Sequence, residues 1–183
     1  MRRRVTSTLP CFLMLCLLLG GCRNDMEKVH FFDQKSLPQQ HLDTVTVIRS
    51  TRGDLQMLLE APEVIVYEKP EKKTEYPQGV WMRLYDKGDK LVSDVRADYA
   101  YSLDDKKIIE ARRHVVIIDY RSGDTSYMES IIWNSAEGRI FSNDTVRSVN
   151  GPRVTIGDGF ESDENFTSPQ ILHQRGTIQI DDE

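Results

Sequence analysis

The sequence has little cysteine and no apolar run long enough to cross a membrane. Two of its three cysteines, Cys11 and Cys16, lie in a short N-terminal apolar stretch that ends at Leu19. A membrane-spanning helix needs about 20 apolar residues, so this stretch is too short to form one. Cys22 is the only other thiol, and we therefore expect neither a disulfide nor a cysteine-ligated metal site in the folded part of the chain.

An excess of positive charge is also missing. The chain has 24 Lys and Arg against 29 Asp and Glu, a net charge of −5. Proteins that bind nucleic acids need a concentrated basic face. Nucleic acid is therefore not an expected partner.

The motifs of common catalytic and metal sites are absent as well. There is no G-x-S-x-G, S-x-x-K or H-E-x-x-H motif, and the four histidines, His30, His41, His114 and His173, lie far apart. His114 precedes an apolar strand and is expected to be a partly buried edge residue. We expect no enzyme activity, no catalytic residue, no metal and no cofactor. A carbohydrate-active enzyme stays open as an alternative, because a glycosidase needs only two carboxylates from anywhere in the chain.

The N-terminus does contain the parts of a secretory signal. Arg2, Arg3 and Arg4 precede the apolar stretch, and Gly20 and Gly21 follow it directly before Cys22. This arrangement resembles a bacterial lipobox, in which the cysteine is lipidated and the peptide is cut before it. We expect a signal peptide over residues 1–21, a lipidated Cys22 with a tether over 22–41, and a folded domain over 42–183. The alternative is an ordinary signal peptide followed by an unmodified cysteine.

From Leu42 onward the pattern is that of β-strands. Apolar and β-branched segments alternate with polar ones and are separated by turn signals such as Lys87-Gly88-Asp89 and Ser122-Gly123-Asp124. No segment favours a helix, and the ambiguous residues 94–101 are interpreted as strand. Gly157 and Gly159 are expected to allow a bend or bulge. The sequence predicts an elongated all-β domain of many short antiparallel strands.

Several segments in order resemble one family. They are L-E-A-P-E-V-I-V-Y-E (residues 59–68), P-Q-G-V-W-M-R-L-Y-D-K-G-D-K (77–90), A-D-Y-A-Y (97–101), R-H-V-V-I-I-D (113–119), I-I-W-N (131–134) and V-T-I-G-D-G-F-E-S-D (154–163). Together they resemble the LptC family, the membrane-anchored periplasmic component of the lipopolysaccharide export machine. The resemblance covers about residues 37–166.

The resemblance implies a twisted-boat β-jellyroll, shared with LptA-like proteins, that carries lipopolysaccharide without enzymatic activity. It implies that the protein accepts lipopolysaccharide from an inner-membrane ABC transporter and passes it to an LptA-like periplasmic bridge protein. Family members commonly have an N-terminal transmembrane helix, where this chain has a lipobox. The implied location is the periplasmic side of the inner membrane. The outer membrane stays open, because Arg23 is not the Asp that retains some lipoproteins at the inner membrane.

Alternation along the strands gives candidate residues for an apolar lipid-binding groove. They are Val64, Val66, Val80, Met82, Leu84, Val95, Ala97, Val115, Ile117, Ile131 and Trp133. Each is also a plausible ordinary core residue, and a register error of one residue would turn a strand's set outward. The last strand, with Ile171, Ile178 and Ile180, is the candidate edge for the bridge protein. A scaffold lipoprotein of the same fold that carries no lipid is the alternative function.

Overall fold

The computed structural model describes residues 37–179, and most of them lie in β-strands. The strands are β1 (Gln40–Thr51), β2 (Asp54–Tyr67), β3 (Lys73–Tyr76), β4 (Val80–Asp86), β5 (Lys90–Ala97), β6 (Tyr99–Leu103), β7 (Ile108–Asp119), β8 (Asp124–Asn134), β9 (Arg139–Asn150), β10 (Arg153–Asp163), β11 (Gln170–Ile171) and β12 (Gln174–Gln179). They form one twelve-stranded antiparallel sheet. The predicted all-β antiparallel class is confirmed, and β5 and β6 cover most of the ambiguous residues 94–101.

The predicted signal peptide, Cys22 and most of the tether lie outside the described residues. β1 begins at Gln40, two residues before the expected start of the domain. Within residues 37–179, no helix has the length and apolar character needed to span a membrane.

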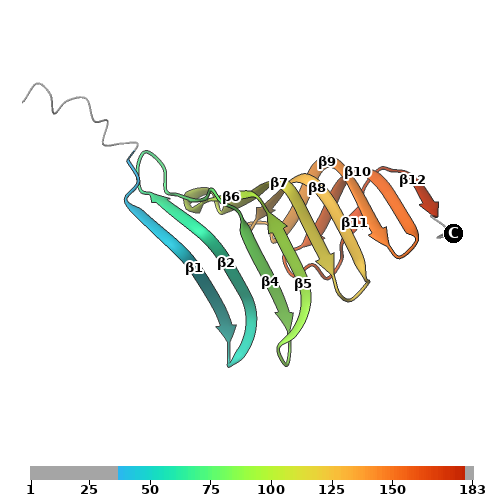
Figure 1. The fold of residues 1–183 in the computed structure, drawn as a ribbon, viewed down its shortest axis with the longest axis horizontal. Coiled ribbons are helices and arrows are strands. Elements are labelled where there is room, and N and C mark those ends of the chain that lie inside the picture. The colour runs from blue at the N-terminus through green and yellow to red at the C-terminus, as the bar shows by residue number, and fades with distance from the viewer. Residues whose placement is uncertain (1–36, 180–183) are drawn as a thin grey trace, which may run out of the picture. The chain divides into compact units, whose positions relative to one another are not determined.

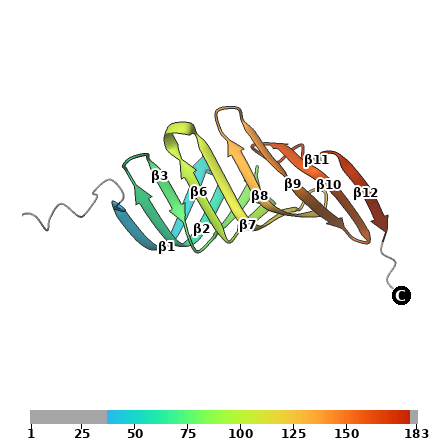
Figure 2. The same ribbon diagram turned by 90° about the horizontal axis from the view of Figure 1, so that it is seen from above.

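The sheet is folded along its length into two layers that face each other (Figures 1 and 2). One layer contains β4 and β5, and the other contains β3 and β6. The long strands belong to both layers. β2 pairs with β4 through residues 57–60 and with β3 through residues 65–67. Likewise, β7 pairs with β6 through residues 108–112 and with β5 through residues 116–119.

Each long strand bends where it crosses between the layers, and several bends are β-bulges. The register shifts between Arg112 and Val115 in β7 and between Asp158 and Phe160 in β10. Gly159 has a φ of 108° there, so the bend predicted from the glycines of this segment is present. The sequence predicted many short strands. Some of these are instead the two halves of one long bent strand, and the longest strand, β2, has 14 residues.

The expectation that His114 is partly buried was wrong. Its side chain is 83% exposed, and its Nδ1 lies 2.7 Å from Asp98 Oδ2. Arg113 and His114 both have positive φ, 64° and 51°. This conformation belongs to the β7 bulge, where the backbone turns at the outer corner of the folded sheet.

The hydrophobic core lies between the two layers. It includes Leu84 and Val95 from one layer and Ala100 and Ala111 from the other. The outer faces are polar: Arg83 pairs with Glu60 on one, and Arg112 with Glu110 on the other. This inside–outside division is the physical reason for the alternation seen in the sequence.

Candidate functional site

An apolar cleft lies between the two layers, with a volume of about 260 Å³. The β1–β2 hairpin, β4 and β5 contribute Val47, Arg49, Met57, Leu59, Val80, Met82 and Val95; the facing layer contributes Tyr76, Ala100, Ile109, Ala111, Ile131, Trp133 and Ile140; and Phe166 comes from the segment between β10 and β11. Almost all of these side chains are hydrophobic. The cleft is therefore an extension of the hydrophobic core rather than a separate polar pocket.

The open side of the cleft lies beside β1. Val47 is 42% exposed although it lines the cleft. Arg49, on the same strand, is also exposed and is the one charged residue of the lining. The cleft thus combines an apolar interior with a positive charge near its opening.

The structure places the predicted groove residues at different depths. Five of them line the cleft: Val80, Met82, Val95, Ile131 and Trp133. Leu84, Ala97 and Val115 are buried in the core, while Ile117 lines a second cavity. Val64 is buried and Val66 is partly buried, and neither lines the cleft. The predicted inward faces of β4, β5 and β7 therefore do face the interior, but only part of the set reaches the cleft.

Sequence reasoning missed Val47, Met57 and Leu59, which line the cleft from β1 and β2. The sequence did contain a signal for them, because all three lie at apolar positions that alternate with other residues along β1 and β2. It also missed Phe166, for which the sequence contains no signal. Phe166 lies outside the strands, and only the path of the chain after β10 brings it to the cleft.

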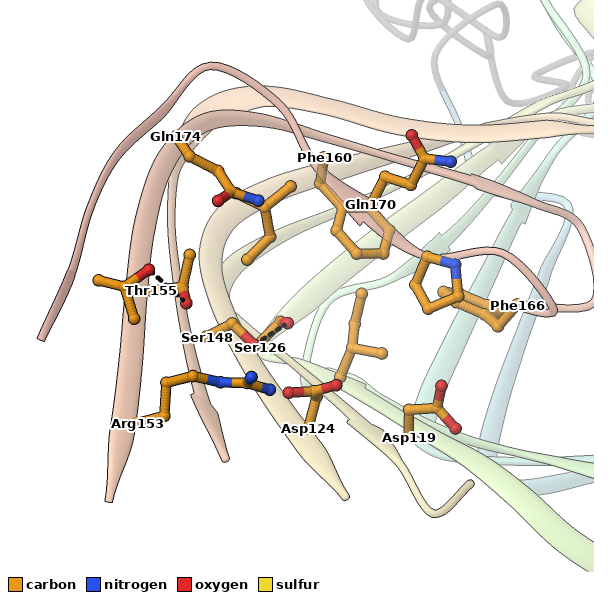
Figure 3. Close-up of a pocket in the computed structure, with 14 residues that line it drawn as sticks. Asp119, Asp124, Ser126, Ser148, Arg153, Thr155, Phe160, Phe166, Gln170 and Gln174 are labelled. Atoms are coloured by element: carbon orange, nitrogen blue, oxygen red, sulfur yellow. Dashed lines mark hydrogen bonds between the residues drawn. The ribbon is translucent and has the colours of Figure 1, made fainter. Parts of the chain in front are cut away.

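A second, polar cavity of about 550 Å³ lies toward the β12 end of the interior (Figure 3). Hydroxyl groups line it: Ser126 Oγ bonds Ser148 Oγ at 3.1 Å, and the hydroxyls of Thr155 and Thr177 lie 3.4 Å apart. Arg153, Gln170 and Gln174 also line it, and apolar side chains form another part of its wall, namely Ile117, Phe160, Phe166, Pro169 and Ile171. This mixed lining is a less favourable environment for an acyl chain than the apolar cleft, because bringing a chain there would strip water from groups that hydrogen-bond.

Two carboxylates, Asp119 and Asp124, also line the polar cavity and are partners across β7 and β8. Asp119 accepts hydrogen bonds from the backbone N–H (2.9 Å) and Nε (3.3 Å) of Arg121. Asp124 accepts one from Asn150 Nδ2 at 3.1 Å. Both carboxylates thus have bonds that stabilise the strand ends. Among residues 37–179, no cluster of His, Cys, Asp and Glu side chains could hold a metal ion.

Phe166 is shared by the linings of the two cavities. It is 2% exposed. Its φ is 53°, an uncommon conformation for a residue other than glycine. The short segment that carries it thus places one aromatic ring in the interior between the two layers.

Hydrogen bonds hold this segment in place. Asp163 Oδ1 accepts the backbone N–H groups of Asn165 (2.9 Å) and Thr167 (3.0 Å), and Asp163 Oδ2 accepts the Thr167 hydroxyl. Arg121 donates to the backbone carbonyl of Phe166. Partial burial raises the pKa of Asp163, but the hydrogen bonds from Thr167 and Asn165 and the charge of Arg121 outweigh this, and the pKa is lowered. The bonds of the loop therefore favour the ionised form of Asp163.

The two ends of the sheet have unpaired strand edges. Within the part of the chain that the structure describes, β1 pairs only with β2, and β12 only with β10. Ile178 of β12 is 59% exposed, as expected of an edge residue. Ile171 is in β11, which also pairs only with β10 among the described residues and so belongs to the same end of the sheet, but its side chain packs against the core. Ile180 lies outside the described residues.

A scan against protein-family models and a search of curated proteins both gave no match to this chain. Function is therefore inferred from the cleft, from Phe166 and from the sheet edges.

Proposed function

We propose that this protein is a lipid-transfer component of the LptC type. It accepts lipopolysaccharide from an inner-membrane ABC transporter, holds acyl chains in the apolar cleft and passes them to an LptA-like periplasmic bridge protein. The observation that supports this most directly is the cleft itself, a hydrophobic interior that opens beside an end strand of the sheet. The sequence resemblance to LptC points to the same role.

The chemistry of the cleft suits a carrier. Burial of apolar surface contributes about 25 cal/mol per Å², so a chain that enters the cleft is stabilised without any specific bond. A ligand held in this way can leave again when a second apolar surface is offered. Arg49 near the opening is placed to attract a phosphate or carboxylate on the head group. No catalytic residue is needed, because the energy for directional transfer comes from ATP hydrolysis in the transporter.

The membrane attachment in this proposal is the lipid on Cys22, followed by the tether. It replaces the transmembrane helix common in the family. Several acyl chains, each contributing about 0.8 kcal/mol per buried CH₂, hold a protein firmly to a bilayer. The domain would then remain at the inner membrane, next to the transporter that supplies its ligand.

The second candidate function is a scaffold lipoprotein that joins envelope proteins through its sheet edges and carries no lipid. The small size of the cleft favours it. Ligand pockets commonly measure about 300–1,000 Å³, and the cleft has a volume of about 260 Å³. On this alternative, changes in the cleft affect only stability.

In-cell photocrosslinking from position 82 distinguishes the two functions. A photoreactive residue in place of Met82, which lines the cleft, should give a lipopolysaccharide adduct that depends on ATP. The same residue in place of Arg83 is the matched control, because Arg83 stacks on Trp81 and pairs with Glu60 on the outer face. An adduct at 82 but not at 83 supports the carrier. The absence of an adduct at 82 in an abundant, folded protein supports the scaffold.

A further inference from the structure

We propose that Phe166 is the wall that ends the acyl-chain cleft and keeps acyl chains out of the polar cavity. This inference rests on the proposed lipid-carrying function. It assigns a specificity role to a residue outside the strands, because the position of this ring determines how far along the interior a chain can enter. The polar cavity beyond it is then excluded from the path of the chain.

The first support is position. Phe166 lines both the apolar cleft and the polar cavity, so its ring lies on the boundary between them. Figure 3 shows it at the edge of the polar cavity, on the side away from Thr155 and Arg153. On this proposal, removal of the ring would join a cleft of about 260 Å³ to a cavity of about 550 Å³ and so triple the interior space open to a ligand.

The second support is the way the ring is held. The side chain is almost completely buried, at 2% exposure, but its backbone belongs to a connection between strands rather than to the sheet. Asp163 holds this connection through Asn165 and Thr167. Arg121, which bonds Asp119 at the end of β7, also donates to the Phe166 carbonyl. The wall is thus fixed to the sheet at two separate points.

The third support is the change in chemistry across the ring. On one side the lining consists of side chains such as Ile131 and Ile140, and on the other side it includes hydroxyl groups such as Ser126 and Ser148. An acyl chain gains from contact with the first, and it would gain less in the second, where it could contact Ile117 and Ile171 but would also desolvate hydrogen-bonding groups. A ring at this boundary therefore keeps the chain in the part of the interior where its burial is most favourable.

The test compares two reporter positions in the full chain in cells. A photoreactive residue replaces either Met82, in the cleft, or Thr155, in the polar cavity. With Phe166 present, we expect a lipopolysaccharide adduct at 82 and at least tenfold less at 155. In Phe166→Ala the adduct at 155 should rise to within about threefold of that at 82, because the acyl chain can then reach the polar cavity.

Phe160→Ala is the matched control. Phe160 has the same side chain and the same 2% exposure, but it lines only the polar cavity, so the adduct at 155 should stay low. Asp163→Asn offers a second route, since it weakens the loop while keeping the ring, and it should raise the adduct at 155 in the same direction. Asp163→Asn can also replace Phe166→Ala as the test variant if the latter fails to accumulate in cells.

The outcomes separate this inference from the function on which it rests. An adduct at 82 together with an unchanged, low adduct at 155 in both Phe166→Ala and Asp163→Asn overturns the wall and leaves the carrier function standing. Equal adducts at 82 and 155 in the unaltered protein also overturn the wall alone. The absence of any adduct at 82 overturns the lipid-carrying function and this inference with it.

Discussion

Asp163 is a single side chain whose hydrogen bonds hold the segment that carries Phe166. Its carboxylate accepts hydrogen bonds from Asn165 and Thr167, and these position Phe166 between the two cavities. The pKa of Asp163 is lowered in the folded protein. The stabilisation that it gives is therefore complete above the unfolded value of 3.8 and is lost as the pH falls through the lower, folded pKa.

We predict that acid loosens this loop through Asp163. The backbone amide resonances of Asn165 and Thr167 should titrate together, with a midpoint below pH 3.8, as protonation removes the charged acceptor. Nuclear magnetic resonance of the labelled protein between pH 2 and 6 measures this. In Asp163→Asn the same two amides should show no such titration. A midpoint at or above 3.8 would contradict the bonding described.

The bends of the long strands are the elements that turn one sheet into two layers. In β8, Met128 and Ile131 both belong to the core although they are three residues apart. In β10, Gly157 and Phe160 are both buried with the same spacing. Strict alternation would place one residue of each pair outside. The bends therefore change which residues of a strand face inward.

Gly157 in β10 gives the sharpest test of how closely these elements pack. A Cβ atom at Gly157 would lie 2.5 Å from Ile171 Cγ2 and 2.5 Å from the Leu172 carbonyl oxygen. We predict that Gly157→Ala destabilises the domain by about 1–3 kcal/mol, the cost typical of overpacking. The free energy of unfolding in urea measures this.

Gly176→Ala is the control for that change. Gly176 lies in β12, and a Cβ atom there would have nothing within 4 Å. Its unfolding free energy should stay within about 0.5 kcal/mol of the original value. If the two variants are equally stable, β11 and the segment after it do not pack on β10 as described.

These bends also mark the limit of what the sequence could predict. Within one half of a strand the alternation was sufficient, so Met82, Val95 and Ile117 were correctly expected on one inward face. Across a bend the period fails, and Met128 was not among the predicted residues. The sequence signals the glycine bulge of β10 but has no signal for the bulge at Arg113 and His114, which is set by pairing with β8.

The cleft was predictable in kind but not in extent. Hydrophobic alternation indicates an apolar interior, yet it cannot separate cleft residues such as Met82 from filled core positions such as Val115. That distinction depends on how closely the two layers approach each other. The contribution of Phe166 to the cleft could not be predicted either, because its burial depends on the path of a segment without regular structure.

The whole domain is one sheet whose end strands, β1 and β12, lie at opposite ends (Figure 1). Free strand edges are templates for pairing with another chain. In the proposed function the two ends therefore have different neighbours. The transporter would face β1, where the cleft opens, and the bridge protein would face β12.

We predict that photocrosslinking in cells separates these neighbours. A photoreactive residue in place of Ile178 on β12 should give an adduct with a soluble periplasmic protein, and one in place of Ile48 on β1, which is 65% exposed, should give an adduct with a membrane protein. Mass spectrometry of the adducts identifies each partner. Exposed Glu129 in the middle of the sheet is the control and should give neither. One shared partner at both ends would contradict this polarity.

The same end-to-end order has a mechanical consequence. The hydrogen bonds of an antiparallel ladder run perpendicular to its strands, so a pull between β1 and β12 acts along those bonds. Each ladder would then carry the full tension in series, so the shortest ladder should open first. Among the described residues β12 is joined only to β10, through residues 153–157, whereas β1 pairs with β2 over almost all of its length; the domain should therefore yield at β12 while its core stays folded.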